Sequence, residues 1–408
     1  METAPKLFGT SGIRGIFSAT PVSNPVDEYV TGNLVTPELA YLLGKSIAIL
    51  HGESDDDEPV EVWRDVRESG EILTKAFLLG LKNGGGEYIY RGISPTVMYT
   101  MRSKSCVIVV TASHNPVEFN GFKVFRQGRP LVRGLEIQIE TMVNDGVADL
   151  DFSLEACRAV VLDEAGDTRE LQLDYYRDSD VMQTIGDRYR FLLSGFYLPL
   201  DLAYGSIACP VEGGQIQQLS PQLAVLMSLG FPVIGYGCFQ DSEKTNERIG
   251  AAYAYGETPD QPGEKELCHF ATGKPGYGLD VERIVFWALR EDETPDRLIE
   301  WSGNPDTVGA WFVLENDYSE SAEPVMVIRL DHESTPSELK TIVEDELQQR
   351  VPLPGFMVDC DADRILVTTP VLAGTEIPYL TGDGMIRFFA ETSPPGTFDE
   401  IAFTVESG

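Results

Sequence analysis

The chain lacks any uninterrupted apolar run of about 18 residues, the length that a membrane-spanning helix needs. Its first residues, METAPKLFGTSG, show no basic segment followed by an apolar one, so we expect no signal peptide. Histidine is scarce, with 4 residues in 408, which argues against a histidine-rich zinc site. The 6 cysteines are scattered without a C-x-x-C pair, so we expect reduced, mostly buried thiols.

Positive charge is also in short supply. The chain has 31 basic residues, of which 10 are lysines, against 65 acidic residues, and its net charge is −34. No basic stripe is present, so we expect no nucleic acid as a partner. The missing apolar run likewise predicts no membrane partner. Salt screens the self-repulsion of such a charge. We therefore expect a cytoplasmic protein of a halophile, with an ordinary acidic protein as the alternative.

Apolar residues make up 42% of the chain, which is typical of globular domains. Residues 60–65, 87–92 and 106–110 are predicted strands, and helices are predicted at 70–83, capped by Ser69, and at 95–103. The continuous apolar run at 106–110 is typical of a parallel strand covered on both faces. This alternation predicts an α/β fold with consecutive domains built on parallel or mixed sheets.

A second α/β unit is expected from about residue 190. Its predicted parts are a strand and its exit at 201–210, a helix at 219–231 and a strand at 232–237. Between about 240 and 330 the pattern is lost. A helix at 335–350 then leads into a predicted strand, loop and strand over 355–370.

Ser113 follows the apolar strand 106–110, in the segment Thr111–Pro116. Ligands of α/β sheets lie beyond the carboxyl ends of the strands, so the serine is expected to face a cleft. Lys123 is close in sequence and could neutralise a phosphate or move a proton. A bare serine at a strand end is more often structural, and that alternative stays open on these residues alone.

Asp359, Asp361 and Asp363 alternate directly after another apolar strand, in D-C-D-A-D-R. Alternate residues of an extended backbone project to one side, so the three carboxylates can converge. Their mutual repulsion favours a hard cation between them, either Mg²⁺ or Ca²⁺. Arg364 adds a positive fork suited to a phosphate. Simple surface acidity is the alternative.

Two further segments carry arginine beside glycine or at a strand end. Residues 9–15 place Arg14 in a loop with three glycines, where backbone amides could cradle an anion. Arg64 and Arg67 follow the strand at 60–65. The alternative for residues 9–15 is a plain turn. The alternative for Arg64 and Arg67 is a surface ion-pair cluster.

Taken together, these stretches resemble the α-D-phosphohexomutase family. The segments that carry the resemblance occur in the family's order: FGTSGIRG (8–15), WRDVRESG (63–70), TASHNP (111–116), NGFK (120–123) and DCDADR (359–364). The match is dense over residues 6–140 and patchy over 190–235 and 335–408. It implies a phosphohexose mutase that interconverts sugar 1-phosphates and 6-phosphates through a phosphoserine at Ser113 and a bound 1,6-bisphosphate.

The resemblance also assigns roles residue by residue. It implies Mg²⁺ held by Ser113, Asp359, Asp361 and Asp363. It makes Lys123 the acid/base, His114 a residue that holds the phosphoserine, and Arg14 an active-site cation. Arg64, Arg67 and Arg364 would bind substrate phosphate. The partners it implies are a hexose phosphate and a hexose 1,6-bisphosphate activator.

The departures from the family pattern are as informative as the matches. Cys360 stands where the family usually has glycine. A cysteine is unfavourable there if the position needs a positive φ. The family's sugar-reading and C-terminal phosphate loops are not found. We therefore expect a first domain at 1–150, a second at 151–374 with an unmatched insertion at about 240–330, the start of a third at 375–408, and no fourth.

The segments GTSGIRG and RESG weakly favour a phosphoglucosamine substrate over glucose and mannose phosphates. A non-catalytic relative that binds a phosphosugar or a partner protein is the alternative function.

Overall fold

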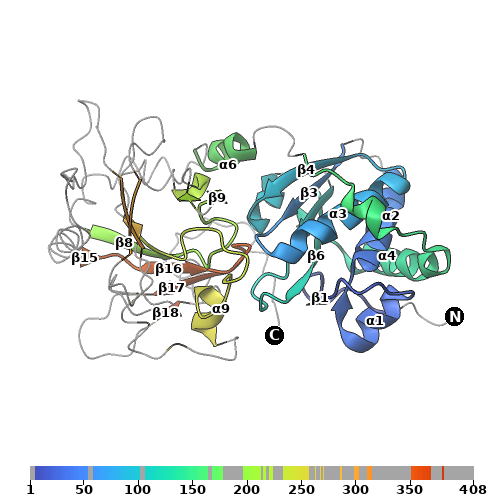
Figure 1. Ribbon diagram of the computed structural model, residues 1–408, viewed down its shortest axis with the longest axis horizontal. Coiled ribbons are helices and arrows are strands. Elements are labelled where there is room, and N and C mark those ends of the chain that lie inside the picture. The colour runs from blue at the N-terminus through green and yellow to red at the C-terminus, as the bar shows by residue number, and fades with distance from the viewer. Residues whose placement is uncertain are drawn as a thin grey trace, which may run out of the picture. The chain divides into compact units, whose positions relative to one another are not determined.

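The structure is a computed structural model that describes residues 5–53, 58–101, 106–163, 168–177, 196–212, 215–216, 220–223, 233–256, 262, 267, 270, 285–286, 298–302, 310–314, 351–368 and 379–380. These residues fall into two compact units, one within residues 1–168 and one within residues 169–392 (Figure 1). Among them, no helix combines the length and the apolar character that crossing a membrane requires.

The first unit is built on a mixed sheet with the strand order β2-β1-β6-β5-β3-β4, and β7 pairs with β6. Its strands are β1 (Ile13–Phe17), β2 (Leu34–Val35), β3 (Val60–Arg64), β4 (Tyr88–Ile93), β5 (Cys106–Val110), β6 (Phe119–Arg126) and β7 (Arg129–Pro130). As predicted, β4, β3 and β5 run parallel to one another. The reversed strand β6 joins them to β1. All five residues of β5 are buried, as the continuous apolar run predicts.

Helices pack against one face of this sheet. They are α1 (Pro25–Gly32), α2 (Pro37–Gly52), α3 (Glu68–Asn83), α4 (Arg133–Gly146) and α5 (Leu154–Arg158), which share one hydrophobic core. Short 3₁₀ turns span Thr96–Met101 and Val147–Asp149. Thr36 caps helix α2: its Oγ1 accepts the N–H of Leu39, and proline follows at the first turn. The predicted helix at 70–83 is confirmed as α3. Ser69 does not cap it, because α3 begins at Glu68 after Arg67.

Two glycines let α2 and α3 approach closely. A Cβ on Gly44 would lie 2.1 Å from the carbonyl oxygen of Phe77, and one on Gly80 would lie 2.0 Å from that of Tyr41. Because either contact is far inside van der Waals range, each helix needs a residue without a side chain where it meets the other. Gly80 therefore permits the packing that buries the core, whatever it costs in helix propensity.

The first unit extends past the boundary expected at residue 150. Cys157 of α5 belongs to its hydrophobic core, and Phe152, Val160 and Leu162 pack against that core. These apolar residues follow α4 without a strand or glycine-rich linker to mark them in the sequence, so the hydrophobic contact sets the boundary.

The second unit has a sheet with the strand order β12-β11-β8-β16-β17-β18, and β15 pairs with β8. These strands are β8 (Phe196–Asp201), β11 (Val233–Tyr236), β12 (Val285–Phe286), β15 (Val351–Pro352), β16 (Gly355–Val358), β17 (Ile365–Thr368) and β18 (Tyr379–Leu380). Two smaller pairs are β9 (Val211–Glu212) with β10 (Gln215–Ile216) and β13 (Leu298–Ser302) with β14 (Ala310–Leu314). The described helices are α6 (Thr168–Arg177) and α9 (Gly250–Tyr255).

Strands β11, β8 and β16 lie side by side and run parallel, so their carboxyl ends meet at one edge of the sheet (Figure 1). The strand expected at 201–210 was placed too late: β8 spans Phe196–Asp201, and the residues after it form turns. The predicted strands around 233–236, 355–358 and 365–368 are confirmed. Tyr379 and Leu380 pair with β17, so this sheet continues beyond the boundary expected at 374.

Three predictions fall largely or wholly outside the described residues. The predicted helix at 335–350 lies outside them completely, and so does most of the helix at 219–231. Of the third domain expected at 375–408, only Tyr379 and Leu380 are described. The cysteine prediction is confirmed for the described residues, where the five cysteines present are buried and none forms a disulfide.

Candidate functional site

Ser113 lies just beyond the carboxyl end of β5, as predicted, and is fully buried. Its backbone is left-handed, with φ at 54°. Residues other than glycine, asparagine and aspartate avoid this region because Cβ crowds the backbone. A serine held there is an outlier of the kind that concentrates at functional positions.

A buried network reaches Ser113 from β3. The N–H of Ser113 donates to Oγ1 of Thr111 over 2.8 Å, and that hydroxyl donates to Oδ2 of Asp65 over 2.6 Å. Asp65 and Thr111 are fully buried. The main chain of the serine is therefore tied to the residue that directly follows the adjacent parallel strand.

Arg67 departs from its expected role in binding substrate phosphate. It is fully buried, and its Nε donates to Oδ2 of Asp65 over 3.0 Å. Its two terminal nitrogens donate to the carbonyl oxygens of Ser113, Asn115, Pro116 and Phe119. A guanidinium has five N–H donors, and these five bonds use all of them. The structure thus places Arg67 beneath the loop that carries Ser113, with no N–H left for a phosphate oxygen.

Arg14 and Lys123 lie on the face of the sheet opposite the helix-packed core. Ile13, Phe122 and Val124 belong to that core, and strand residues alternate between faces, so Arg14 and Lys123 point the other way. Arg14 pairs with Gly121, and Lys123 pairs with Val109 of β5. Three adjacent strands, β1, β6 and β5, therefore carry Arg14, Lys123 and, just past its end, Ser113. Lys123 is buried, and Nε and Nη2 of Arg14 are buried with no hydrogen-bond partner among the described residues.

Arg64 and His114 are half-buried at the same edge of the sheet. Nε of Arg64 donates to the hydroxyl of Tyr90 over 2.9 Å, and Nη1 donates to the carbonyl of Asp65 over 3.0 Å. The guanidinium of Arg64 is thereby oriented by one contact to β4 and one to the residue that follows it in the chain. His114 lies in the turn that follows Ser113.

A buried carboxylate anchors the segment that leads into the Gly9–Gly15 loop. Oε1 of Glu140 in α4 accepts the N–H groups of Leu7 and Phe8 over 2.9 and 3.0 Å, and Arg133 donates to both of its carboxylate oxygens. Burial alone would raise the pKa of Glu140. The hydrogen bonds from Arg133, Phe8 and Leu7 outweigh it and hold the pKa below its usual value of 4.5.

The second unit carries the acidic triplet directly after β16. Each of Asp359, Asp361 and Asp363 offers a carboxylate oxygen, and these three atoms lie within 4.8 Å of one another. Asp359 and Asp361 are fully buried, whereas Asp363 is exposed. Buried carboxylates this close repel one another, and a hard cation removes the repulsion. The predicted convergence is confirmed, and the donor set fits a divalent ion with oxygen ligands. Arg364 is half-buried, and its N–H donates to Oδ1 of Asp359.

At the same sheet edge, a buried carboxylate ties the turn after β8 to the start of α9. Fully buried Asp201, at the end of β8, accepts the N–H groups of Ala203 and Gly250. Cys360 has no positive φ, so the expected conflict at that position does not arise. The left-handed residue of the loop is Ala362, with φ at 54°.

Comparison with known proteins agrees with the geometry of the first unit. Residues 5–148 match the family description "Phosphoglucomutase/phosphomannomutase, alpha/beta/alpha domain I". These residues are similar to domain I of the phosphoglucomutase/phosphomannomutase family. The matched residues include Ser113, Arg14 and Lys123, so the buried serine and both cations lie within this matched domain.

Two curated relatives carry the name phosphoglucosamine mutase. The protein from Alkaliphilus metalliredigens is 34% identical over 255 residues, which are 61% of this chain and 49% of the relative. The protein from Syntrophomonas wolfei is 30% identical over 260 residues, which are 62% of this chain and 50% of the relative. The chain thus spans about half the length of these relatives. A solved phosphoglucomutase/phosphomannomutase family protein from Burkholderia thailandensis is 17% identical, with a TM-score of 0.46, over 95% of this chain and 58% of that one.

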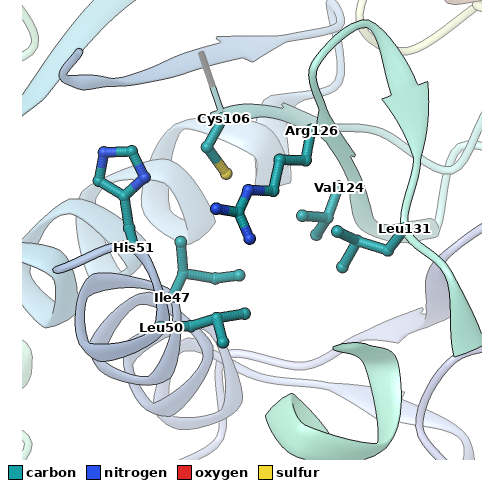
Figure 2. Close-up of a pocket in the computed structure, with 7 residues that line it drawn as sticks. All are labelled: Ile47, Leu50, His51, Cys106, Val124, Arg126 and Leu131. Carbon is teal, nitrogen blue, oxygen red and sulfur yellow. The ribbon is translucent and has the colours of Figure 1, made fainter. Parts of the chain in front are cut away.

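Figure 2 shows a small pocket in the first unit. It is lined by Ile47, Leu50, His51, Cys106, Val124, Arg126 and Leu131. Cys106 begins β5, whereas Ser113 follows the end of that strand, so the pocket lies at the strand's opposite end. Its volume of about 10 Å³ is the lower limit for one water molecule, far too small for a sugar phosphate.

Sequence reasoning missed the residues that hold the two loops. Thr111, Asp65 and Asn246 were not assigned a role, although each makes a buried hydrogen bond to these loops. Asp201, which accepts the N–H groups of Ala203 and Gly250, was also missed. A threonine two residues before the serine is a signal for a side-chain-to-backbone turn and could have identified Thr111. The partners of Asn246 and Asp201 are separated from them by 114 and 49 positions, and no local pattern connects them.

Proposed function

We propose that this chain is a phosphohexose mutase that interconverts hexose 1-phosphate and hexose 6-phosphate through a phosphoserine at Ser113. The observation that carries the proposal is a fully buried, left-handed Ser113 at the end of β5, inside the residues that match domain I of the family. Lys123 comes from the adjacent strand β6 and Arg14 from β1, the strand beyond it, and such cations would relieve charge on a phosphoryl group.

The proposed reaction has two balanced steps. In the first, the bond from phosphorus to Oγ of Ser113 breaks, and a bond forms to the free hydroxyl of the hexose phosphate. Lys123 accepts the proton of that hydroxyl, and the product is a bound 1,6-bisphosphate. In the second, the other phosphate returns to Oγ, and Lys123 gives its proton to the oxygen that is released. A hexose 1,6-bisphosphate supplies the first phosphoryl group to unmodified Ser113.

Mg²⁺ is the proposed metal, held by Asp359, Asp361 and Asp363, with an oxygen of phosphorylated Ser113 completing the set. When bound, it would neutralise charge on the transferred phosphoryl group. The three converging carboxylate oxygens support this assignment, because Mg²⁺ prefers oxygen ligands. Arg364, which follows the triplet directly, would bind a substrate phosphate together with Arg14 and Arg64. His114 would help to hold the phosphoserine.

A phosphoglucosamine is the proposed substrate. Both relatives described above are named phosphoglucosamine mutases, which supports this choice over glucose and mannose phosphates. The alternative is a relative that binds a phosphosugar without turning it over. The chain spans about half of its relatives' length, so this alternative needs a direct test.

The test is a coupled assay of conversion from 1-phosphate to 6-phosphate, run with Mg²⁺, a hexose 1,6-bisphosphate primer and molar KCl. Glucosamine, glucose and mannose phosphates are compared in parallel. Intact-mass spectrometry follows phosphoryl uptake from the bisphosphate in the parent and in Ser113→Ala. We expect turnover and uptake in the parent and neither in the variant. Binding of the sugar phosphate without turnover or uptake in the parent would establish the alternative. Equal uptake in both proteins would show that Ser113 is not the acceptor.

A further inference from the structure

Both backbone groups of Ser113 are held by buried side chains. Its N–H donates to Oγ1 of Thr111 over 2.8 Å, and its carbonyl oxygen accepts from Nη2 of Arg67 over 2.7 Å. Holding the two groups on either side of Cα restricts φ and ψ together. The left-handed φ of 54° at Ser113 is unfavourable by itself, so such restraints are needed to keep it.

The two side chains that hold Ser113 share one anchor. Oδ2 of Asp65 accepts from Oγ1 of Thr111 over 2.6 Å and from Nε of Arg67 over 3.0 Å. Hydrogen bonds therefore run in a closed ring from Asp65 to Thr111, to Ser113, to Arg67 and back to Asp65. Oδ1 of Asp65 also accepts the N–H of Arg67, so both of its carboxylate oxygens are engaged.

The ring fixes the direction of the Thr111 hydroxyl. A hydroxyl has one proton, and an ionised carboxylate can only accept. The Thr111 proton therefore points at Asp65, and its lone pairs are left to accept the N–H of Ser113. All four residues are fully buried, so water does not compete for these bonds.

Arg67 extends the restraint to the rest of the loop. Besides Ser113, it binds the carbonyl oxygens of Asn115, Pro116 and Phe119. Because the guanidinium is buried, these carbonyls are turned toward the interior of the protein.

We propose that Asp65, Arg67 and Thr111 are positioning residues that hold Ser113 in its left-handed conformation and so direct its hydroxyl for phosphoryl transfer. This inference rests on the proposed function, because it assigns these residues to the same serine. None of the three acts on substrate. They limit the directions in which Oγ can point, and misplacing a reacting atom by about 1 Å can slow a reaction by about 100-fold.

Thr111→Val is the decisive variant, because valine keeps the shape of threonine and removes the hydroxyl. Thr111→Ser restores the hydroxyl and serves as the rescue. Thr74→Val in α3 is the matched control: Thr74 is also a fully buried threonine, and its Oγ1 has no hydrogen-bond partner among the described residues. The variants are compared in phosphoryl uptake from a hexose 1,6-bisphosphate and in steady-state turnover.

We expect Thr111→Val to slow uptake and to lower kcat by about 10- to 100-fold, with KM changed by less than about twofold. In Thr111→Ser and Thr74→Val, the rate of uptake and kcat should both stay within about threefold of the parental values. Uptake by Thr111→Val at the parental rate would overturn the proposal. So would an equal loss in Thr111→Val and Thr74→Val, because that result would show general destabilisation.

Hydrogen exchange measured by mass spectrometry separates this proposal from the proposed function. Peptides that cover residues 111–116 should exchange about fivefold faster in Thr111→Val than in the parent, which corresponds to the loss of one hydrogen bond. Thr111→Ser should restore the protection. If the parent takes up no phosphoryl group, the proposed function fails, and this comparison still tests the ring. Equal exchange in parent and Thr111→Val would overturn the ring itself.

Arg67→Lys provides a second variant. Lysine keeps the positive charge beside Asp65, but it has three donors and no planar fork for the five acceptors that Arg67 binds. Uptake should fall further than in Thr111→Val, with faster exchange across residues 113–119. Parental uptake in a folded Arg67→Lys protein would overturn the role of Arg67. If this variant does not fold, the Thr111 series decides alone.

Discussion

Oδ1 of Asn246 accepts a hydrogen bond of 3.0 Å from the backbone N–H of Cys360, across 114 positions of sequence. The carbonyl oxygen of Cys360 accepts the N–H of Ser206 over 2.7 Å. Both backbone groups of Cys360 are thus held by other loops at the carboxyl edge of the same sheet, and its side chain is fully buried. The positive φ of the acidic loop falls instead on Ala362.

A glycine substitution should therefore lower the free energy of unfolding at Cys360 and raise it at Ala362. Cys360→Gly removes a buried side chain where no positive φ needs relief, and we expect it to lower the free energy of unfolding by about 1–3 kcal/mol. Ala362→Gly relieves a left-handed alanine, and we expect a gain of up to about 1 kcal/mol. Chemical denaturation of the two variants and the parent measures both effects. A stabilising Cys360→Gly would show that the loop differs from this description.

The Asp359–Asp361–Asp363 triplet should make the protein bind Mg²⁺ tightly and gain thermal stability from it. Asp361 is fully buried, so Asp361→Asn removes a charged ligand without opening the loop to solvent. We expect Mg²⁺ affinity, measured by calorimetry in molar KCl, to fall at least tenfold, with a smaller rise in Tm on adding Mg²⁺.

A protein of net charge −34 also attracts cations without a specific site, so the Mg²⁺ experiment needs a matched control. Asp145→Asn makes the same change of charge at an exposed position in α4 of the first unit. This variant should bind Mg²⁺ as the parent does. Equal losses in Asp361→Asn and Asp145→Asn would mean that the triplet is not a metal site.

The parts of the fold and site that could be predicted are those that local patterns determine. Apolar runs located β3, β4, β5 and β16, and parallel strands put Ser113 and the acidic triplet at carboxyl edges. Alternation along an extended backbone was enough to bring the three aspartates together.

The parts that could not be predicted depend on distant contacts. Ser69 has the composition of a helix cap, but Arg67 and the loop it binds set the start of α3, and the Ser69 hydroxyl accepts from Asn120 instead. The sequence also does not reveal that Arg67 is buried, because an arginine in a charged motif looks like a surface or ligand-binding residue. Its five acceptors come from positions 65 and 113–119, which meet only in the folded sheet.

Glu140 should contribute stability at neutral pH and lose it in acid. Its pKa in the folded protein lies below 4.5, so its stabilising effect is complete above that pH and disappears as the pH falls through the lower, folded-state value. Glu140→Gln should lower the free energy of unfolding at pH 7 by about 1–3 kcal/mol, because the N–H groups of Leu7 and Phe8 lose a charged acceptor. The difference from the parent should stay constant from pH 7 to 5.5 and shrink below pH 4.5.

Glu136→Gln is the control for this pH series, because Glu136 also binds Arg133 but anchors no backbone in the described contacts. Its effect should be below about 1 kcal/mol at every pH. Comparing each variant with the parent at the same pH isolates the contribution of Glu140. A difference between Glu140→Gln and the parent that grows as the pH falls below 4.5 would contradict the lowered pKa.

Salt should stabilise this protein more than a neutral osmolyte does. A net charge of −34 on 408 residues makes the folded state repel itself, and compactness increases that repulsion. The Debye length shortens from about 10 Å at 0.1 M to about 3 Å at 1 M, so KCl should raise Tm steeply over this range and only weakly above it. Sucrose acts by exclusion from the surface and should raise Tm gradually, without a plateau. A Tm that does not change between 0.1 and 1 M KCl would mean that the acidic residues are spaced or paired so that their repulsion is already small, and the expectation of a halophilic protein would fail with it.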